Sequence, residues 1–344
     1  MTRSSRLPAQ VATVPCRVNL IGEWIDFNGG TVLPMALAPS VTVQLAANGM
    51  TLDRIRSTNF EAIQDFSVDA PAEGHWSDYV RGALQYARDQ NWIQGGQDLS
   101  VHSTIPVGAG LSSSAAIIVA TLKAASIGNG NVDGASLASA AKKIENDFIG
   151  VPCGIMDQMA VALGEPGVAL ALHTRDCSYA LLSLPETWAI VVIHSGVNRA
   201  LSDGRYRIRR DQCLAAAAAL GVEYLCDADL VSITTLDDPL RRRARHAATE
   251  AKRSLDAIAA LRAGDRSRFG QLMIESHDSL RDDMDVSVQE VDQLVQDAVR
   301  LGADGARITG AGFGGCIVAL VDPDHVETWW SALKLRHPSI ARVA

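Results

Sequence analysis

The chain has 344 residues, of which 47% are hydrophobic and 20% are charged, a composition typical of a globular protein long enough for two domains. The formal net charge of −8 argues against a nucleic-acid or membrane-surface partner, and no run reaches the ~18 apolar residues of a transmembrane helix. The N-terminus lacks the apolar run of a signal peptide, and the six cysteines form no CxxC pair, so we expect a reducing, cytoplasmic location without zinc or disulfides.

Strand-like and helical segments alternate in the first half of the chain. The pattern predicts strands at 31–47 and 98–105, helices at 112–126 and 136–148, and three more strands at 167–173, 179–184 and 188–194. The second half is mostly helical, at about 202–220, 240–263, 267–280 and 287–301, and closes with a strand pair around 308–320. The arginine-rich stretch 239–245 is interpreted as a helix start or a solvated helix face. The composition shifts near residue 195, which predicts domains at 1–195 and 196–344 in an α+β fold.

The most informative stretch is the glycine- and serine-rich loop 106–116, which joins a predicted strand to a predicted helix. Such a loop presents free backbone N–H groups and the positive end of the helix dipole to one point, which favours phosphate binding. Gly108 and Gly110 allow close approach of the backbone, and Ser112, Ser113 and Ser114 add hydroxyl groups. The loop lacks the lysine of a Walker A motif. The alternative is a small-residue cap on an ordinary helix.

Two further segments carry charged residues among apolar ones. In 16–30, Arg17, Glu23 and Asp26 could bind a polyol and stabilise a transferring phosphoryl group, or could form a turn with a local ion pair. In 145–160, Glu145 is a candidate Mg²⁺ ligand. Asp157 is a candidate general base, and the alternative is a helix-capping aspartate.

The segment 309–315 matches GxGxxG at Gly310, Gly312 and Gly315. A dinucleotide-binding fingerprint would open a long βαβ unit, whereas here a strand-like segment follows and the chain ends soon after. We therefore interpret the segment as a glycine-rich hairpin that approaches another loop.

Together these segments resemble, in order and spacing, the three signature motifs of the GHMP kinases. Within that family the chain is most similar to the galactokinases, on residues 17–23 with Asp26 and 28–30. Similar stretches include 75–80, 151–158 and 275–283, and the resemblance runs from about residue 14 to 321. It implies a two-domain GHMP kinase fold with the active site in the cleft between the lobes.

The resemblance implies transfer of a phosphoryl group from ATP to the anomeric hydroxyl of galactose or a galactose-like sugar, with Mg²⁺. Asp157 matches the catalytic aspartate, and Arg17 matches the arginine that restrains its carboxylate. The implied metal partners are Ser113 and Glu145. The implied sugar contacts are Glu23, Trp24, Asp26, Gly154 and Tyr206, and the implied ATP contacts are Trp76, Tyr79, Gly108, Gly110, Leu111, Ser112, Ser113, Ser114 and Gly312. We expect a monomer or a weak homo-oligomer.

The sequence departs from the galactokinase pattern at Trp24, where the family has histidine, at Phe27, where it has tyrosine, and at Ala311, which interrupts the third glycine triplet. The N-terminus is also shorter than in typical galactokinases. Because the replaced histidine contacts the C6 end of the sugar in the family, we expect a galactose-configured sugar altered at C6 to be tolerated or preferred, unless Trp24 packs away from the sugar. An alternative function is a kinase-like sensor that binds ATP and sugar and regulates other proteins. Asp157, Arg17 and the uninterrupted serine loop favour the enzyme.

Overall fold

The computed structural model describes residues 9–106, 109–130, 132–197 and 204–344. The chain divides into two compact units, each of them discontinuous in sequence. Unit 1 contains Met1–Arg17, Ala36–Ile105 and Ser112–Pro166, and unit 2 contains Val18–Met35, Pro106–Leu111 and Gly167–Ala344. The domains predicted from composition, 1–195 and 196–344, divide the chain differently from these two units, and that boundary stays a prediction. Among the described residues, no helix is both long and apolar enough to cross a lipid bilayer.

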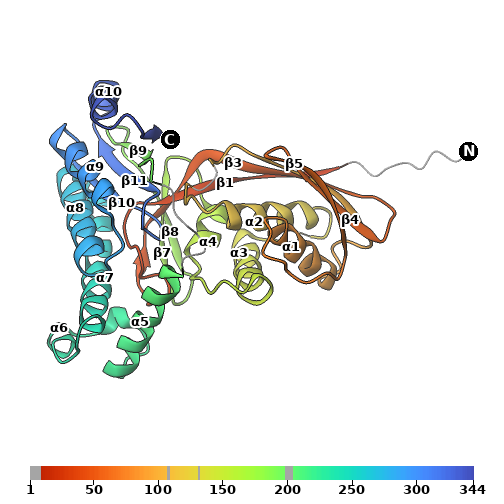
Figure 1. Ribbon diagram of the computed structural model, residues 1–344, viewed down its shortest axis with the longest axis horizontal. Helices are drawn as coiled ribbons and strands as arrows, with labels where there is room; N and C mark the ends of the chain where they lie inside the picture. Colours follow the sequence, from red (N-terminus) through yellow and green to blue (C-terminus); the bar gives the residue numbers. More distant parts are fainter. Residues whose placement is uncertain (1–8, 107–108, 131, 198–203) are drawn as a thin grey trace, which may run out of the picture. The chain divides into compact units, whose positions relative to one another are not determined.

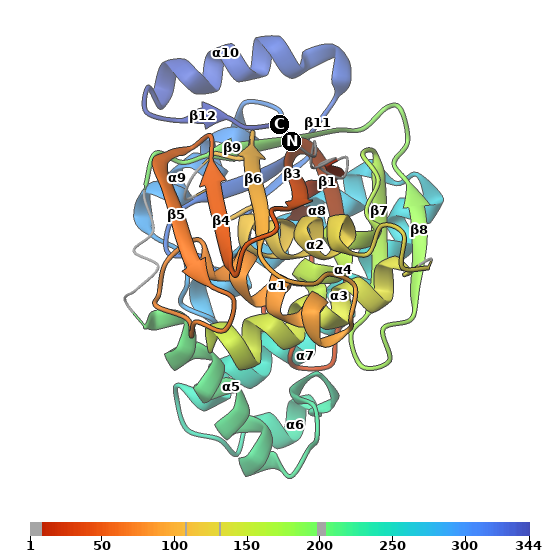
Figure 2. The ribbon, with the colours of Figure 1, turned by 90° about the vertical axis from the view of Figure 1, so that its right-hand side faces the viewer.

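Unit 1 is built on a mixed sheet. The strands β3 (Pro34–Ala47), β6 (Gln97–Ser103), β4 (Leu52–Ser57) and β5 (Phe60–Ser67) pair in that order, and β1 (Gln10–Asn19) pairs with β3. β3 and β6 are antiparallel, β6 and β4 are parallel, and β4 and β5 form an antiparallel hairpin, so the four strands lie side by side in Figure 2. Buried apolar residues alternate with polar ones along β3 and β6, which is the pattern of a sheet with one face packed and one face solvated.

The helices of unit 1 pack around α2 (Ser113–Ala125), which directly follows the serine loop. Its alanine, isoleucine, valine and leucine residues are buried on nearly all sides, because α1 (Asp78–Asp89), α3 (Gly134–Lys143) and α4 (Met156–Leu163) all contact it (Figure 1). A π-helical turn, Ile144–Ile149, continues α3 and ends at Gly150, which has a φ of +77°. This turn carries Glu145. Inserted π turns of this kind are frequent at functional sites.

Unit 2 contains two groups of antiparallel strands. The first is β2 (Thr31–Val32), β7 (Val168–His173) and β8 (Tyr179–Ser183). The second is a four-stranded sheet in the order β10 (Gly305–Ile308), β11 (Cys316–Val321), β9 (Ala189–His194) and β12 (Ala341–Arg342). β10 and β11 pair in antiparallel register from Gly305–Leu320 to Ile308–Ile317. This pairing confirms the predicted hairpin across the glycine-rich segment.

The long helices of unit 2 pack on one another and on this sheet. α7 (Leu240–Ala263) lies along α8 (Arg266–Asp282), which packs on β10 together with α9 (Gln289–Arg300), as Figure 1 shows. Gly270 of α8 makes this approach possible, because a Cβ atom there would lie 2.2 Å from the backbone oxygen of Asp304. The remaining helices are α5 (Arg205–Leu220), the short α6 (Leu230–Ile233) and α10 (Val326–Arg336).

The arginine-rich stretch 239–245 is the start of α7, as predicted, but it is not simply solvated. Arg243 is almost fully buried, and its guanidinium donates to the backbone oxygen of Asp283 and to Gln212 Oε1. The sequence patterns did not predict β1, β4, β5, α1, α4 or α10. The α+β class is confirmed by the mixed sheets and segregated helices.

Candidate active site

In unit 1, Arg17 and Asp157 form a bidentate ion pair although 140 positions separate them. Arg17 Nε lies 2.8 Å from Asp157 Oδ1, and Arg17 Nη2 lies 2.7 Å from Asp157 Oδ2. The Arg17 side chain is 5% exposed and that of Asp157 is 33% exposed, so the pair is largely buried with its carboxylate still reachable from solvent. Such paired, charge-assisted hydrogen bonds fix the orientation of the carboxylate.

Ser112 gives Asp157 a third donor. Its hydroxyl donates to Asp157 Oδ2, and Ser112 itself has a left-handed backbone with a φ of +58°. The Ser112 side chain is therefore directed at Asp157 rather than at the first turn of α2. Asp157 lies in the first turn of α4, after Ile155 at the N-cap position, so the alternative interpretation of Asp157 as a helix cap is not what the structure shows.

Glu145 lies in the same unit in a polar cluster. Gln158 Nε2 donates to Glu145 Oε2, and the Cys153 thiol lies 3.8 Å from the same oxygen. The Ser114 hydroxyl lies near enough to this carboxylate to lower its pKa. Burial raises the pKa of Glu145 above its ordinary value, and the negative charge of Asp157 raises it further. The raised pKa means that the charged carboxylate lacks sufficient compensating positive charge in this cluster.

The hydroxyl beside Glu145 belongs to Ser114, whereas Ser113, the predicted metal partner, is exposed at the start of α2. Tyr79 of α1 is electrostatically coupled to Glu145, and burial followed by that negative charge raises the pKa of its hydroxyl. Trp76 lies just before α1 and is partly buried, while Gly154 is buried just before α4. Unit 1 therefore gathers Arg17, Ser112, Ser114, Tyr79, Glu145 and Asp157.

In unit 2, the segment 22–28 forms a tight, buried turn. Trp24 has a φ of +65°, which is rare for a bulky side chain, and Asn28 Nδ2 donates to its carbonyl oxygen over 2.7 Å. The indole ring is 4% exposed and packs on Tyr206 with ring centroids 4.8 Å apart and on Phe27 at 6.2 Å. Its Nε1 is buried without a hydrogen-bond acceptor among the described residues. Two predicted sugar contacts, Trp24 and Tyr206, are thus in direct contact.

The carboxylate of Glu23 is also buried in unit 2. Its Oε1 accepts hydrogen bonds from Thr309 Oγ1 at 2.8 Å and from the Gly310 amide at 2.7 Å, and it lies 3.1 Å from Arg307 Nη2. These contacts bring the first motif to the third, as the glycine-rich segment suggested. Asp26 is partly exposed in the same turn.

The remaining predicted ATP contacts are loop residues. Gly110 has a φ of +74°, and Leu111 is buried. Gly312 has a φ of +81°, and a Cβ atom there would lie 2.4 Å from the Val286 carbonyl oxygen, so only glycine fits. Gly108 lies outside the described residues.

Sequence reasoning did not assign four residues that the structure brings to these clusters: Gln158, His246, Glu250 and Arg307. Gln158 directly follows Asp157, the candidate base, so its position in the family-like stretch 151–158 could have marked it as a site residue. The other three lie on α7 and β10, far from segment 22–24 in the sequence, and no local pattern marks them.

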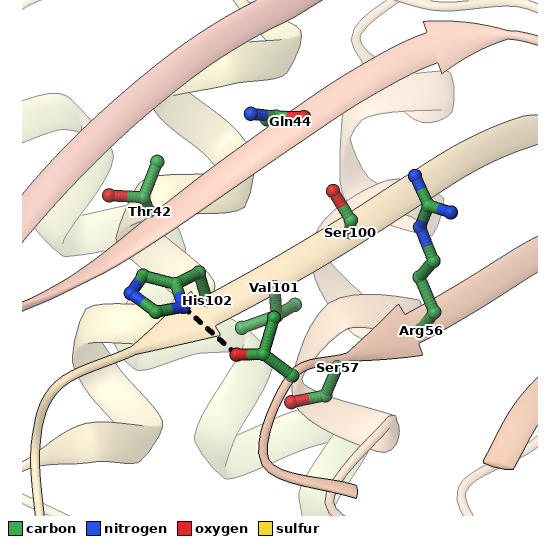
Figure 3. A pocket seen from close by; sticks show the side chains of 8 residues that line it. Thr42, Gln44, Arg56, Ser57, Ser100, Val101 and His102 are labelled. Carbon is green, nitrogen blue, oxygen red and sulfur yellow. Dashed lines mark hydrogen bonds between the residues drawn. The ribbon is translucent and has the colours of Figure 1, made fainter. Parts of the chain in front are cut away.

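A cavity of about 340 Å³ lies elsewhere, on the solvated face of the unit 1 sheet. It is lined by Thr42, Gln44, Arg56, Ser57, Thr58, Ser100, Val101 and His102. Figure 3 shows Gln44, Ser100 and Arg56 side by side on β3, β6 and β4. The Thr58 hydroxyl and His102 Nδ1 are hydrogen-bonded over 2.9 Å. This open polar face contains none of the residues of the two clusters.

Comparison with known proteins identifies the family. A profile described as "GHMP kinases N terminal domain" matches residues 78–165, one described as "GHMP kinases C terminal" matches 257–338, and one described as "Galactokinase galactose-binding signature" matches 3–47. The chain is similar to the Lactococcus lactis galactokinase whose crystal structure was determined in complex with galactose. The identity is 31% and the TM-score 0.90, over 97% of this chain and 93% of that one.

Two more distant structures share the fold. Methanococcus jannaschii mevalonate kinase is 18% identical with a TM-score of 0.74, over 99% of this chain and 98% of that chain. Streptococcus pneumoniae phosphomevalonate kinase, solved with phosphomevalonate and AMPPNP, is 14% identical with a TM-score of 0.72, over 97% and 98%. The close match to one galactokinase over nearly the whole chain, together with all three profiles, settles the relationship: this protein belongs to the GHMP kinase family, among its galactokinase-like members.

Proposed function

We propose that this protein transfers the γ-phosphoryl group of ATP to the anomeric hydroxyl of galactose or of a galactose-like sugar. The observation that carries the proposal is the buried, bidentate pair of Arg17 and Asp157, with Ser112 as a third donor to the carboxylate. The galactose-binding signature at 3–47 and the similarity to a galactokinase support the same substrate class. A sugar sensor without catalysis has no need of a carboxylate held in this way.

Asp157 is the proposed general base. Arg17 and Ser112 occupy fixed directions around its carboxylate, so the oxygen that receives the sugar's proton is oriented before the substrate binds. Arg17 also places a permanent positive charge beside the reacting groups, where negative charge develops on the transferring phosphoryl group. Phosphoryl transfer depends on such positioning and charge stabilisation more than on covalent chemistry.

The proposed sugar contacts are Glu23, Trp24, Asp26, Gly154 and Tyr206. The indole of Trp24 offers one N–H donor and a broad apolar face, in contrast to the imidazole that the family has at this position. Trp24 is only 4% exposed and packs on the partly exposed Tyr206, so the proposed role of the indole is to support the Tyr206 ring, which would face an apolar side of the sugar. We therefore propose that a sugar altered at C6, such as arabinose, a 6-deoxy sugar or a uronic acid of galactose configuration, is accepted.

The residues around Glu145 fit a Mg²⁺ ion that is bound jointly with the phosphates of ATP. Mg²⁺ prefers oxygen ligands, and this cluster supplies the Glu145 carboxylate and the Ser114 hydroxyl. Gln158 Oε1 is a buried oxygen without a hydrogen-bond partner among the described residues. The pKa of Glu145 is raised, and a cation bound beside the carboxylate would lower it again. Bound Mg²⁺ would neutralise phosphate charge.

The ATP contacts proposed from the sequence are Trp76, Tyr79, Gly108, Gly110, Leu111, Ser112, Ser113, Ser114 and Gly312, with Ser113 and Glu145 as the metal partners first expected.

A coupled assay of ADP release across a panel of aldoses tests the function. We expect Mg²⁺-dependent turnover with galactose or one of its C6-altered relatives, and a product whose phosphate is at the anomeric position by ³¹P NMR. ATP and sugar binding without ADP release would instead support the sensor. Light scattering tests the proposed monomer or weak homo-oligomer, and cell fractionation tests the proposed cytoplasmic location.

A further inference from the structure

The segment Gly22–Trp24 has a backbone that needs external support. Gly22 has a φ of +98° and Trp24 a φ of +65°, so two of three consecutive residues are left-handed. The conformation is free of cost for glycine but strained for tryptophan, by about 1–3 kcal/mol in general. Such a conformation persists only where surrounding contacts hold it in place. This segment also carries Glu23 and Trp24, two of the proposed sugar contacts.

Two side chains of α7 hold the main chain of this segment. Glu250 Oε1 accepts from the Gly22 amide at 3.0 Å, and His246 Nε2 lies 3.0 Å from the Glu23 carbonyl oxygen. Because a carbonyl only accepts, His246 Nε2 carries the hydrogen. His246 and Glu250 are four positions apart and therefore lie on one face of α7, and both are fully buried.

Glu250 is itself fixed from two further directions. Ser276 of α8 donates to its Oε1 over 2.7 Å, and Arg253 Nε donates to its Oε2 over 2.7 Å. Burial opposes ionisation of Glu250, but the nearby positive charges, Arg253 first, lower its pKa, so it is a charged acceptor for the Gly22 amide. The support of the segment is thus tied to the α7–α8 packing of unit 2.

Arg307 acts on the side chain of Glu23. Its guanidinium is fully buried on β10, and its Nη2 lies 3.1 Å from Glu23 Oε1, the oxygen that also accepts from Thr309 and Gly310. The three guanidinium nitrogens have no hydrogen-bond partner among the described residues. A buried charge with so few partners is costly, and well-packed apolar residues often serve stability equally well in such positions. What apolar residues would not supply is a positive charge 3.1 Å from Glu23 Oε1, which attracts the carboxylate to this position.

We propose that His246, Glu250 and Arg307 are positioning residues for sugar recognition, which hold segment 22–24 and the Glu23 carboxylate in the geometry that the sugar requires. This inference rests on the proposed sugar kinase function. The expected effect of disturbing the cluster is selective. Affinity for the sugar falls while affinity for ATP is kept, because these contacts all lie around the Glu23 segment.

The test compares His246→Leu, which removes the N–H donor to Glu23, with His246→Gln, which keeps an N–H at a similar position. Arg307→Lys keeps a positive charge but carries it on a shorter and more flexible side chain, so the charge no longer lies at the position of Nη2 beside Glu23 Oε1. Trp329→Phe is the matched control, since the Trp329 indole makes a buried side-chain-to-backbone hydrogen bond of 2.9 Å to Ala298 in the same unit, away from this segment. For each protein, KM for the sugar, KM for ATP and kcat are measured, and calorimetry gives Kd for the sugar and for AMPPNP.

We expect His246→Leu to raise KM and Kd for the sugar by about tenfold or more, with the ATP values within about twofold of wild type. His246→Gln should restore most of the loss, Arg307→Lys should resemble His246→Leu, and Trp329→Phe should change neither KM. Unchanged sugar KM and Kd in folded His246→Leu and Arg307→Lys would overturn the inference. A parallel rise of both KM values in these variants and in the control would overturn it as well.

If His246→Leu does not fold, Arg307→Lys decides the question. A wild-type protein that binds sugar without turnover refutes the proposed kinase function, yet the Kd values for sugar and AMPPNP still test the positioning role. A wild-type protein that binds no sugar refutes both.

Discussion

Replacing Asp157 by asparagine separates its proposed catalytic role from its structural one. Asparagine has the same shape but cannot accept the sugar's proton, so kcat should fall by about 10²–10⁴-fold, or ~2.7–5.4 kcal/mol in the barrier. In this variant the Arg17 guanidinium, which is 5% exposed, still has the amide oxygen of the asparagine as an acceptor but loses the second, charged carboxylate oxygen. Loss of one charge-assisted hydrogen bond costs about 1.5–3 kcal/mol of stability.

This loss of stability cannot imitate the catalytic loss. A protein stabilised by only about 5 kcal/mol would keep about 2 kcal/mol, which leaves more than ~95% of the molecules folded. The assay is steady-state ADP release with saturating sugar and ATP, alongside thermal unfolding of the same samples. AMPPNP affinity should stay near the wild-type value.

The control is Asp65→Asn. Asp65 also pairs with an arginine in unit 1, with Arg54 Nε at 2.9 Å and Nη2 at 3.5 Å, but both side chains are nearly half exposed. This variant should keep wild-type kcat. If folded Asp157→Asn retains more than about a tenth of wild-type kcat, general base catalysis by Asp157 is refuted and its role is structural.

Three further predictions concern the metal, the pH dependence of stability and the sugar. Ser114→Ala should raise the Mg²⁺ concentration needed for half-maximal activity more than Ser113→Ala does, since Ser114 is the serine beside Glu145; an effect of Ser113→Ala alone would restore the expectation from the sequence. The pKa of Glu145 is raised above its ordinary 4.5, so the stability it contributes is present below that value and is lost as pH rises through the higher folded pKa. Without Mg²⁺, Glu145→Gln should therefore raise Tm at pH 8 but not at pH 4, and equal shifts at both would contradict the burial argument. Trp24→His should raise kcat/KM for galactose relative to arabinose and 6-deoxy analogues; a wild-type preference for galactose that the substitution leaves unchanged would show that Trp24 only packs on its neighbours.

The parts of the fold that the sequence predicted are those with strong local periodicity. α7, α8 and α9 follow the helical repeat, and β7, β8 and β9 are short apolar runs that end at turn residues, so their predicted ranges agree with the structure to within a few residues. β4 and β5 were missed because their charged residues hide the alternation that marks a strand. α4 was missed because it is only eight residues long and follows a Pro/Gly turn.

For the candidate site, the sequence determined which chemical groups are available, because the three motifs carry the family's pattern in the order of the chain. The pairing of Arg17 with Asp157 was predicted from that resemblance, and the structure shows it. Which serine meets Glu145 was not determined, because the choice depends on how the first turn of α2 is rotated relative to the π-helical turn 144–149. That rotation is set by packing around α2 rather than by the residues of the loop.

Only the tertiary structure decided the surroundings of Glu23 and Trp24. The sequence shows a carboxylate and an indole in a short turn, but the groups that hold them, His246, Glu250 and Arg307, lie more than 200 positions away. Local propensity reports on neighbours within a few residues, whereas the position of a buried charge depends on which distant helices and strands close over it. For this protein the sequence by itself therefore determined the family and the candidate reacting groups, and the packing of α7, α8 and β10 determined how segment 22–24, the proposed sugar-binding segment, is held.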